Sequence, residues 1–291
     1  MKKILLLGKN GQVGWEAWRT LSCLGEVIAL DYPDVDFTRP QTLETLVNEI
    51  KPGIIYNAAA YTAVDRAESE PELARAINAT AVGALAQAAR KTKAVLVHFS
   101  TDYVFDGKKG SPYVESDRPN PLNHYGVTKL EGEQAIQQVD CAYLTFRTTW
   151  VYSMRRDSFV SKVLQWSKGK PSLRVVSDQV SSPTWARALA EATGQVLARG
   201  GSELVDWVYQ RRGIYHLAGA GSTSRMNWAK AILNNRPEGE APVEVIPALS
   251  SEFPTPAERP LFSVLDCSYF SATFDLQLPP WEKALGLAME G

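Results

Sequence analysis

The stretch Ile4-Leu5-Leu6-Leu7-Gly8-Lys9-Asn10-Gly11-Gln12-Val13-Gly14 decides the fold. Its apolar run is typical of a strand that is buried on both faces. Glycines stand at positions 8, 11 and 14, and a helical pattern runs from Val13 to about Leu24. Strand, glycine turn and helix together are typical of a dinucleotide site, where a pyrophosphate meets a helix N-terminus. The alternative is an ordinary glycine-rich turn.

The second predicted strand, 27–31, ends in a carboxylate, Asp31. An acid at this place usually accepts hydrogen bonds from the adenosine ribose, which favours NAD over NADP. Lys9 and Arg39 are close in the sequence, however, and either can meet a 2′-phosphate. The choice between NADH and NADPH therefore stays open. Asp36 and Phe37 follow and are expected to flank the adenine. The plainer alternative is that Asp31 only ends a strand.

Strands and helices alternate over the first half of the chain. Helical patterns cover 40–51, 72–91 and the segment after Pro121, and further strands are expected at 53–56, 94–99 and 141–147. This alternation predicts an α/β fold, a Rossmann-type doubly wound parallel sheet with a smaller C-terminal substrate-binding lobe. We expect residues 1–151 to form the dinucleotide-binding domain, with 172–212 returning to it. The lobe then comprises 152–171 and 213–291, and Thr184 is expected to cap a helix over 185–198.

Two strand ends carry candidate binding residues, because ligands of open α/β sheets lie at the carboxyl ends of the strands. Small residues follow the third strand, so a ribose or a flat ring can approach the backbone; they are Ala58, Ala59, Ala60 and then Tyr61. The fourth strand delivers Ser100, Thr101, Asp102 and Tyr103 to the same edge. Asn78 lies in the long alanine-rich helix and is either a core amide or a site residue.

Tyr125 and Lys129 are four residues apart in a predicted helix and therefore share one face. A cation beside a phenol lowers the pKa of the phenol, which would let Tyr125 act as a general acid near neutrality. The pair alone is a weak signal, since an exposed lysine near a half-buried tyrosine is common in helices. Thr101 at a strand end and the glycine turn strengthen the catalytic interpretation.

Composition excludes several classes of function. The 291 residues contain 31 Lys and Arg against 32 Asp and Glu, so no basic field exists to hold nucleic acid. No run approaches the ~20 apolar residues of a membrane span, and the apolar run at the N-terminus is too short for a secretion signal. Cys23, Cys141 and Cys267 are widely spaced and form neither a metal pattern nor a disulfide framework. We therefore expect a cytoplasmic protein without membrane or nucleic-acid partners.

Six motifs in chain order resemble those of the dTDP-4-dehydrorhamnose reductase family of extended short-chain dehydrogenase/reductases. They are GKNGQVG (8–14), NAAAYTAVD (57–65), STDYVFDG (100–107), YGVTK (125–129), RTTWVY (147–152) and AERPLFSVLD (257–266). The resemblance spans nearly the whole chain. It implies hydride transfer from NADPH or NADH to C4 of dTDP-4-dehydro-L-rhamnose, giving dTDP-L-rhamnose, a precursor of cell-envelope polysaccharide.

The resemblance also implies residue roles. Tyr125 would donate the proton, Lys129 would lower the pKa of Tyr125 and bond the nicotinamide ribose, and Thr101 would donate a hydrogen bond to the reacting carbonyl oxygen. Asn78 would support the proton relay. The cofactor would be held by the glycine turn at Gly8, Asn10, Gly11, Gln12 and Val13 and by the ribose and adenine residues named above. The sugar pocket would contain Asp102, Tyr103 and Trp150, with Arg259 near the substrate diphosphate.

One departure concerns a metal. Some members of the family bind Mg2+ between acidic residues at a dimer interface, and Glu16 stands at the first matching position. Arg187 stands at the second, and a cation there opposes a magnesium site. We expect no metal, and a monomer or a homodimer without a metal bridge.

Two alternative functions remain at this stage. One is a non-catalytic, cofactor-binding regulatory subunit like that of methionine adenosyltransferase. The other is a reductase or epimerase of a different nucleotide sugar.

Overall fold

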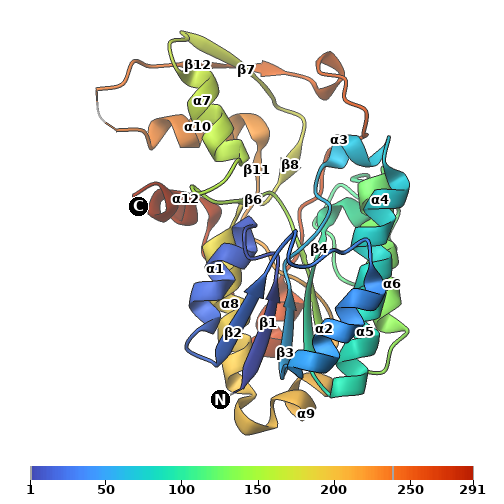
Figure 1. The fold of residues 1–291 in the computed structure, drawn as a ribbon. Coiled ribbons are helices and arrows are strands. Elements are labelled where there is room, and N and C mark those ends of the chain that lie inside the picture. Colours follow the sequence, from blue (N-terminus) through green and yellow to red (C-terminus); the bar gives the residue numbers. More distant parts are fainter. Residues whose placement is uncertain (1, 238, 291) are drawn as a thin grey trace.

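The computed structural model describes residues 2–237 and 239–290, and its centre is a six-stranded sheet (Figure 1). The spatial order is β10-β5-β4-β3-β1-β2, and all neighbouring strands are parallel. The strands are β1 (Lys3–Leu7), β2 (Glu26–Leu30), β3 (Ile54–Asn57), β4 (Val95–Thr101), β5 (Ala142–Thr148) and β10 (Gly213–His216). The predicted doubly wound parallel sheet is confirmed.

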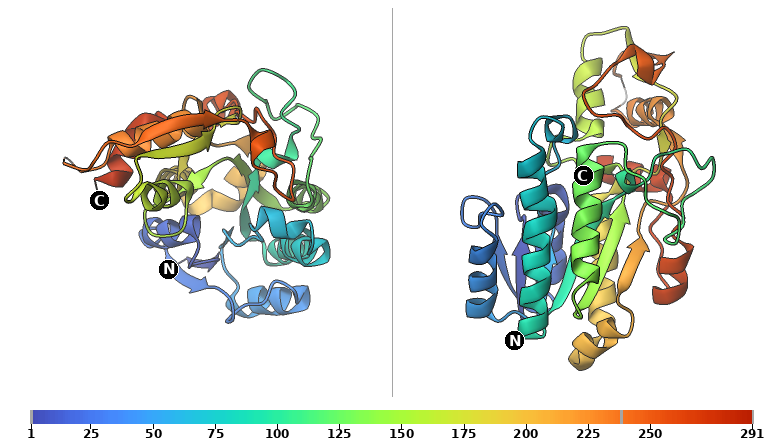
Figure 2. Two further views of the ribbon diagram at one scale, coloured as in Figure 1. Left: turned by 90° about the horizontal axis from the view of Figure 1, so that it is seen from above. Right: turned by 90° about the vertical axis from the view of Figure 1, so that its right-hand side faces the viewer.

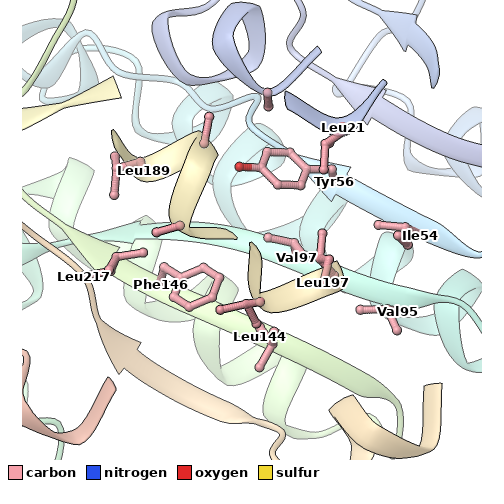
Figure 3. Close-up of a cluster of buried hydrophobic side chains, with 14 of the residues drawn as sticks. Leu21, Ile54, Tyr56, Val95, Val97, Leu144, Phe146, Leu189, Leu197 and Leu217 are labelled. Carbon is pink, nitrogen blue, oxygen red and sulfur yellow. The ribbon is translucent and has the colours of Figure 1, made fainter. Parts of the chain in front are cut away.

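Helices cover both faces of this sheet, which is why its central strands are apolar on both sides. One face packs against α1 (Gln12–Leu21), α8 (Ala186–Arg199), α9 (Leu204–Tyr209) and α11 (Ser268–Phe274). The other packs against α2 (Pro40–Ile50), α5 (Ala81–Thr92) and α6 (His124–Gln137). Figure 3 shows the first core, where Tyr56 and Phe146 of the sheet lie against Leu189 and Leu197 of α8.

A smaller lobe lies beyond the carboxyl ends of the strands (Figures 1 and 2). Its parallel pair is β7 (Ser172–Val176) with β12 (Glu244–Ala248). Three helices pack around a separate core centred on Trp228: α7 (Phe159–Ser167), α10 (Arg225–Asn234) and α12 (Trp281–Met289). Short pairs join the lobe to the sheet domain, β6 (Val151–Tyr152) with β9 (Thr184–Trp185) and β8 (Val180–Ser181) with β11 (Thr223–Ser224).

The structure corrects the predicted domain division at two places. β7 lies within 172–212 but pairs with β12 in the lobe, and β10 begins at Gly213 but pairs with β5 in the central sheet. Both are short apolar strands, and only the partner strand, which is distant in sequence, decides the sheet that each joins. The predicted cap is also wrong: Thr184 lies in β9 and donates to Ser182 O, and Trp185 precedes α8 without a capping bond.

The predicted helix over 72–91 is one continuous but irregular column. It consists of α4 (Pro71–Arg75), a π-helical segment (Ala76–Thr80) and α5, and the short helix α3 (Val64–Ala67) precedes it. A π-helical turn inside a helix often marks a functional region. Here it carries Asn78, which is fully buried. Among the described residues, no helix has both the length and the apolar composition needed to cross a bilayer.

A buried ion pair links α6 to the central sheet. Arg147 on β5 donates from Nε and Nη2 to the two carboxylate oxygens of Glu133, at 2.9 and 2.7 Å. The side chains are only 3% and 1% exposed. His216 on β10 lies against the same guanidinium, with Nε2 3.5 Å from Arg147 Nη1 and Nδ1 3.0 Å from Tyr113 O. Because Tyr113 O only accepts, His216 carries its proton on Nδ1.

Acid is expected to destabilise the protein through this histidine. Burial, assisted by Arg147, lowers the pKa of His216 to about 3, so the unfolded chain binds a proton that the folded chain does not. Stability is retained above the unfolded pKa of about 6.5 and falls below it by about 1.4 kcal/mol per pH unit. His216 by itself is thus expected to lower the free energy of unfolding by about 2 kcal/mol from pH 7 to pH 5.

Urea titrations at the two pH values check this, with His216→Gln as the comparison. The variant should lose that part of the pH dependence whatever its stability at pH 7. An unchanged pH slope in the variant would contradict the assignment.

Candidate active site

A cleft of 2290 Å³ lies between the carboxyl ends of the central strands and the lobe. It brings together most of the residues singled out from the sequence: Gly8, Asn10, Gly11, Gln12, Val13, Asp31, Ala58, Ala59, Ala60, Thr101, Asp102, Tyr103, Tyr125, Lys129, Trp150 and Arg259. Asp36, Phe37, Tyr61 and Asn78 do not line it. The cleft therefore joins the predicted cofactor turn to the tyrosine–lysine helix.

Close packing requires glycine at two positions of the turn between β1 and α1. Gly8 has a φ of +86°, and a Cβ there would lie 2.7 Å from Ala59 N at the end of β3. A Cβ on Gly14 would lie 1.9 Å from Gly8 O. Gly11 precedes α1 without a side-chain capping bond, so the first amides of the helix remain available to an anion.

Gly14→Ala is expected to deform this turn, because the 1.9 Å contact can be relieved only by moving backbone. We expect a loss of about 1–3 kcal/mol in the free energy of unfolding and weaker binding of the reduced cofactor. Fluorescence titration and urea unfolding measure the two effects. Gly286→Ala in α12 is the matched control, since its Cβ would meet only Asn235 Oδ1 at 3.9 Å. Unaltered cofactor binding in Gly14→Ala would contradict the role of the turn.

The nucleotide end of the cleft contains Asp31, whose two carboxylate oxygens accept from Asn10 N and Tyr32 N, both at 2.8 Å. The two cations considered for a 2′-phosphate are already paired. Lys9 Nζ lies 3.2 Å from Asp34 Oδ2, and Arg39 Nε lies 3.5 Å from Asp36 Oδ2. All four side chains are at least partly exposed, and such pairs are weak.

Two pairs of predicted cofactor residues, which do not line the cleft, contact other parts of the chain around it. Asp36 accepts from the amide and hydroxyl of Thr38, and Phe37 is buried in the core beneath α2. Asn78 accepts from Tyr61 N and donates to Tyr61 O and to Thr128 Oγ1, so it ties the loop after β3 to α6. The Tyr61 hydroxyl donates to Glu70. These residues shape the wall of the cleft from behind.

Thr101 lies at the end of β4, and its hydroxyl donates to Asp102 Oδ1 at 3.0 Å and accepts from Tyr103 N at 3.1 Å. Asp102 is fully buried and accepts from Thr149 and Ser263 as well. Burial raises the pKa of Asp102, and these hydroxyls oppose the shift. The bond to Asp102 therefore sets the orientation of the Thr101 hydroxyl beside Tyr125.

The expected lowering of the Tyr125 pKa is not found. Burial raises the pKa of Tyr125, and the neighbouring Thr101 hydroxyl opposes the shift. Lys129 does not reach the phenol, because its Nζ donates to Phe99 O at 2.5 Å. The sequence spacing puts both residues on one helix face, but the amino group of Lys129 binds the carbonyl of Phe99 on β4 and not the phenol. A raised pKa keeps Tyr125 protonated at neutral pH, which is the form that a proton donor requires.

Lys129 is 1% exposed, and burial lowers its pKa to about 8. Its Nζ also lies 3.3 Å from His98 Nε2. Asn57 Oδ1 accepts from Ala59 N, so Asn57 Nδ2 faces His98 Nδ1 at 3.1 Å as a donor. His98 then accepts at Nδ1 and carries its proton on Nε2, pointing at Lys129. A donor aimed at Nζ disfavours the ammonium and so acts in the same direction as burial, which lowers the pKa of Lys129.

The far wall of the cleft is aromatic and cationic. Trp150 has a φ of +43°, a conformation rare for a tryptophan, and its indole stacks on Trp228 with ring centroids 5.5 Å apart. Arg259 lines the cleft, but its guanidinium is bound to Asp65 at 2.7 Å and to Thr255 and Ala257 O. Arg225, which sequence reasoning did not single out, also lines this wall. No local pattern around Arg225 signals that place.

Three arginines surround Glu16, the residue considered above for a metal and expected to bind none. Burial raises the pKa of Glu16, and the nearby charges of Arg155, Arg187 and Arg19 oppose the shift. Arg187 Nε is 2.8 Å from Glu191 Oε1. Within residues 2–237 and 239–290, no three His, Cys, Asp or Glu side chains are grouped as a metal site.

A nicotinamide dinucleotide fits the cleft. Gly8 and Gly14 stand where a side chain would meet backbone, and Gly11, Gln12 and Val13 at the start of α1 line the cleft. Ser100 Oγ, Thr148 Oγ1 and Gln12 Oε1 line the cleft, are buried, and have no hydrogen-bond partner in the described chain. Buried polar atoms without partners are costly, so these three are suited to contact a polar ligand.

A doubly wound sheet that places a glycine turn and a Tyr-x-x-x-Lys helix on one cleft is the construction of the extended short-chain dehydrogenase/reductases, and the protein is of that class. Within the class, the family model for the RmlD substrate binding domain matches residues 1–290. The chain belongs to that family.

Relatives with known activity or structure match over nearly their full length. The chain is 43% identical to the dTDP-4-dehydrorhamnose reductase of Burkholderia thailandensis, covering 99% of this chain and 98% of that protein. A crystal structure of a dTDP-4-dehydrorhamnose reductase from Clostridium acetobutylicum has a TM-score of 0.90 at 36% identity, covering 99% and 98% of the two chains. The Bacillus anthracis enzyme, solved in complex with NADP, has a TM-score of 0.89 at 32% identity, covering 100% and 99%.

Proposed function

We propose that the protein is an NAD(P)H-dependent reductase that converts dTDP-4-dehydro-L-rhamnose to dTDP-L-rhamnose. The observation that carries the proposal is the joint placement of Thr101, Tyr125 and Lys129 in one cleft with the glycine turn. The family relationship supports the same activity, since similar proteins of nearly equal length are dTDP-4-dehydrorhamnose reductases.

The chemistry adds one hydride and one proton to a ketone. The reduced nicotinamide, when bound, supplies the hydride that forms the new C–H bond at C4. Tyr125 gives the proton from Oη to the C4 oxygen as negative charge develops there. The Thr101 hydroxyl, which donates to Asp102 in the structure and neighbours the phenol, turns in this proposal to donate to the C4 oxygen. Lys129, whose Nζ donates to Phe99 O on β4, bonds the nicotinamide ribose in this proposal.

The substrate lies against the far wall in this proposal. Asp102 and Tyr103 close the sugar end, and Trp150 supplies a flat apolar face. The ion pair with Asp65 orients Arg259 at the rim. Two further features belong to the proposal: a monomer or a homodimer without a Mg2+ bridge, supported by the arginines around Glu16, and a cytoplasmic location, supported by three free cysteines.

A direct assay tests the function. Purified protein is mixed with reduced cofactor and the 4-keto dTDP-sugar, and the absorbance of the reduced nicotinamide is followed; we expect stoichiometric oxidation. Competition by dTDP, UDP and GDP sugars identifies the nucleotide. Tight cofactor retention without turnover would overturn the reductase and favour a regulatory binding role. Turnover of a UDP- or GDP-sugar alone would overturn the assigned substrate.

A further inference from the structure

Arg225 is the first residue of α10, and its guanidinium lies over an aromatic platform in the lobe. The guanidinium carbon is 3.8 Å from the ring centroid of Trp150 and 4.8 Å from that of Phe159. Trp228 lies beneath both rings, stacked on Trp150 and on Phe159. The aromatic faces attract the cation and fix its plane, so the side chain is preorganised.

The guanidinium has no hydrogen-bond partner among the described residues. Burial lowers the pKa of Arg225 to about 10, and no hydrogen bond contributes to the shift, only the more distant charges of Tyr103, Asp102 and Arg259. The group stays cationic at neutral pH. Arg225 is partly exposed and lines the cleft, so its five N–H donors are available to an anion that enters it. Arg259 differs, because its donors are taken up by Asp65, Thr255 and Ala257.

The position of Arg225 indicates which anion it binds. The glycine turn and α1 provide the phosphate site on the sheet side of the cleft, whereas α10, which begins at Arg225, belongs to the lobe (Figure 1). Other cations of the lobe, Lys162 on α7 and Lys170 after it, line the same cleft. A second anion, distinct from the cofactor pyrophosphate, is therefore favoured there. Paired phosphates match the planar fork of an arginine.

We propose that Arg225 is a substrate-binding residue that holds the diphosphate of the nucleotide sugar, with its guanidinium fixed on Trp150 and Phe159. The assignment rests on the proposed function and deepens it. In this assignment the diphosphate binds Arg225 and not Arg259, because the Arg259 guanidinium is paired with Asp65 on α3.

Calorimetric titration of the full chain with dTDP, with thymidine and separately with NADPH tests the proposal without turnover. The wild type is expected to bind dTDP far more tightly than thymidine. Arg225→Met should weaken dTDP by about 10- to 100-fold and leave thymidine and NADPH unchanged, because one charge-assisted contact is lost. Arg225→Lys should give an intermediate loss, since it keeps the charge without the fork.

Lys230→Met is the matched control, as an exposed cation on the same helix that does not line the cleft. It should bind all three ligands as the wild type does. Wild-type dTDP affinity in Arg225→Met, in a protein that still binds NADPH, would overturn the role of Arg225 alone. Failure of the wild type to bind dTDP would overturn the proposed function as well. Arg225→Gln serves as the test variant if the methionine variant does not fold.

Discussion

Tyr125→Phe is expected to lower kcat by about 10³-fold. The phenol is the proton donor, and phenylalanine keeps the ring while it removes the only proton that the side chain can give. The ring packs edge to face on Tyr103, with centroids 5.8 Å apart, and this packing is preserved in the variant. The Kd for reduced cofactor should therefore change little. Single-turnover kinetics and fluorescence titration measure the two quantities.

Lys129→Met tests the role of Lys129 separately from that of Tyr125. It removes the group that contacts Phe99 O and His98 on β4, so both kcat and cofactor affinity should decrease.

Tyr209→Phe is the matched control for the hydroxyl lost in Tyr125→Phe, because the Tyr209 hydroxyl bonds Asp140 at the surface. Substantial turnover by Tyr125→Phe would show that another group donates the proton.

Glu133→Gln is expected to destabilise the protein by about 3–5 kcal/mol. Arg147 would keep its charge at 3% exposure without a carboxylate partner, and a buried unpaired charge is strongly unfavourable. The effect should appear as a lower urea midpoint with an unchanged slope. The catalytic side chains are on the same helix, α6, so activity per folded molecule should also be measured.

The double variant Glu133→Leu, Arg147→Met should recover most of that loss, because removing both charges removes the unpaired one. The exposed pair Arg187–Glu191 on α8 provides the comparison. Glu191→Gln should change the free energy of unfolding by less than about 1 kcal/mol. A small effect of Glu133→Gln, similar to that of Glu191→Gln, would mean that water or another group compensates Arg147.

The local pattern of the chain was sufficient for the sheet domain. Short apolar strands, glycines at 8, 11 and 14, and helices of regular period predicted the order of elements from β1 to β5, because each of these signals acts over a few residues. The Tyr125–Lys129 spacing predicted a shared helix face for the same reason. The residues grouped at the ends of β3 and β4 follow from the geometry of parallel sheets.

Contacts between segments distant in the sequence determined the strand pairing of the lobe and the pKa values in the site. The sequence near β7 and β10 does not say which strand each will pair with, and both were assigned to the wrong part of the fold. The pKa values of the site residues could not be predicted from the sequence for the same reason. A helical spacing brings Lys129 and Tyr125 to one face, but burial and the carbonyl of Phe99 determine the pKa of each group.

Arg225 and Arg259 show the division most clearly. Arg225 lies in a segment without a distinctive pattern, and Arg259 is singled out only because its motif, AERPLFSVLD, resembles one of a known family. The sequence by itself determined the strands, the glycine turn and the faces of the helices, because these depend on neighbours along the chain. Tertiary structure alone decided which arginine is paired with a carboxylate and which lies unpaired over an aromatic platform, because that depends on side chains from distant segments meeting in space.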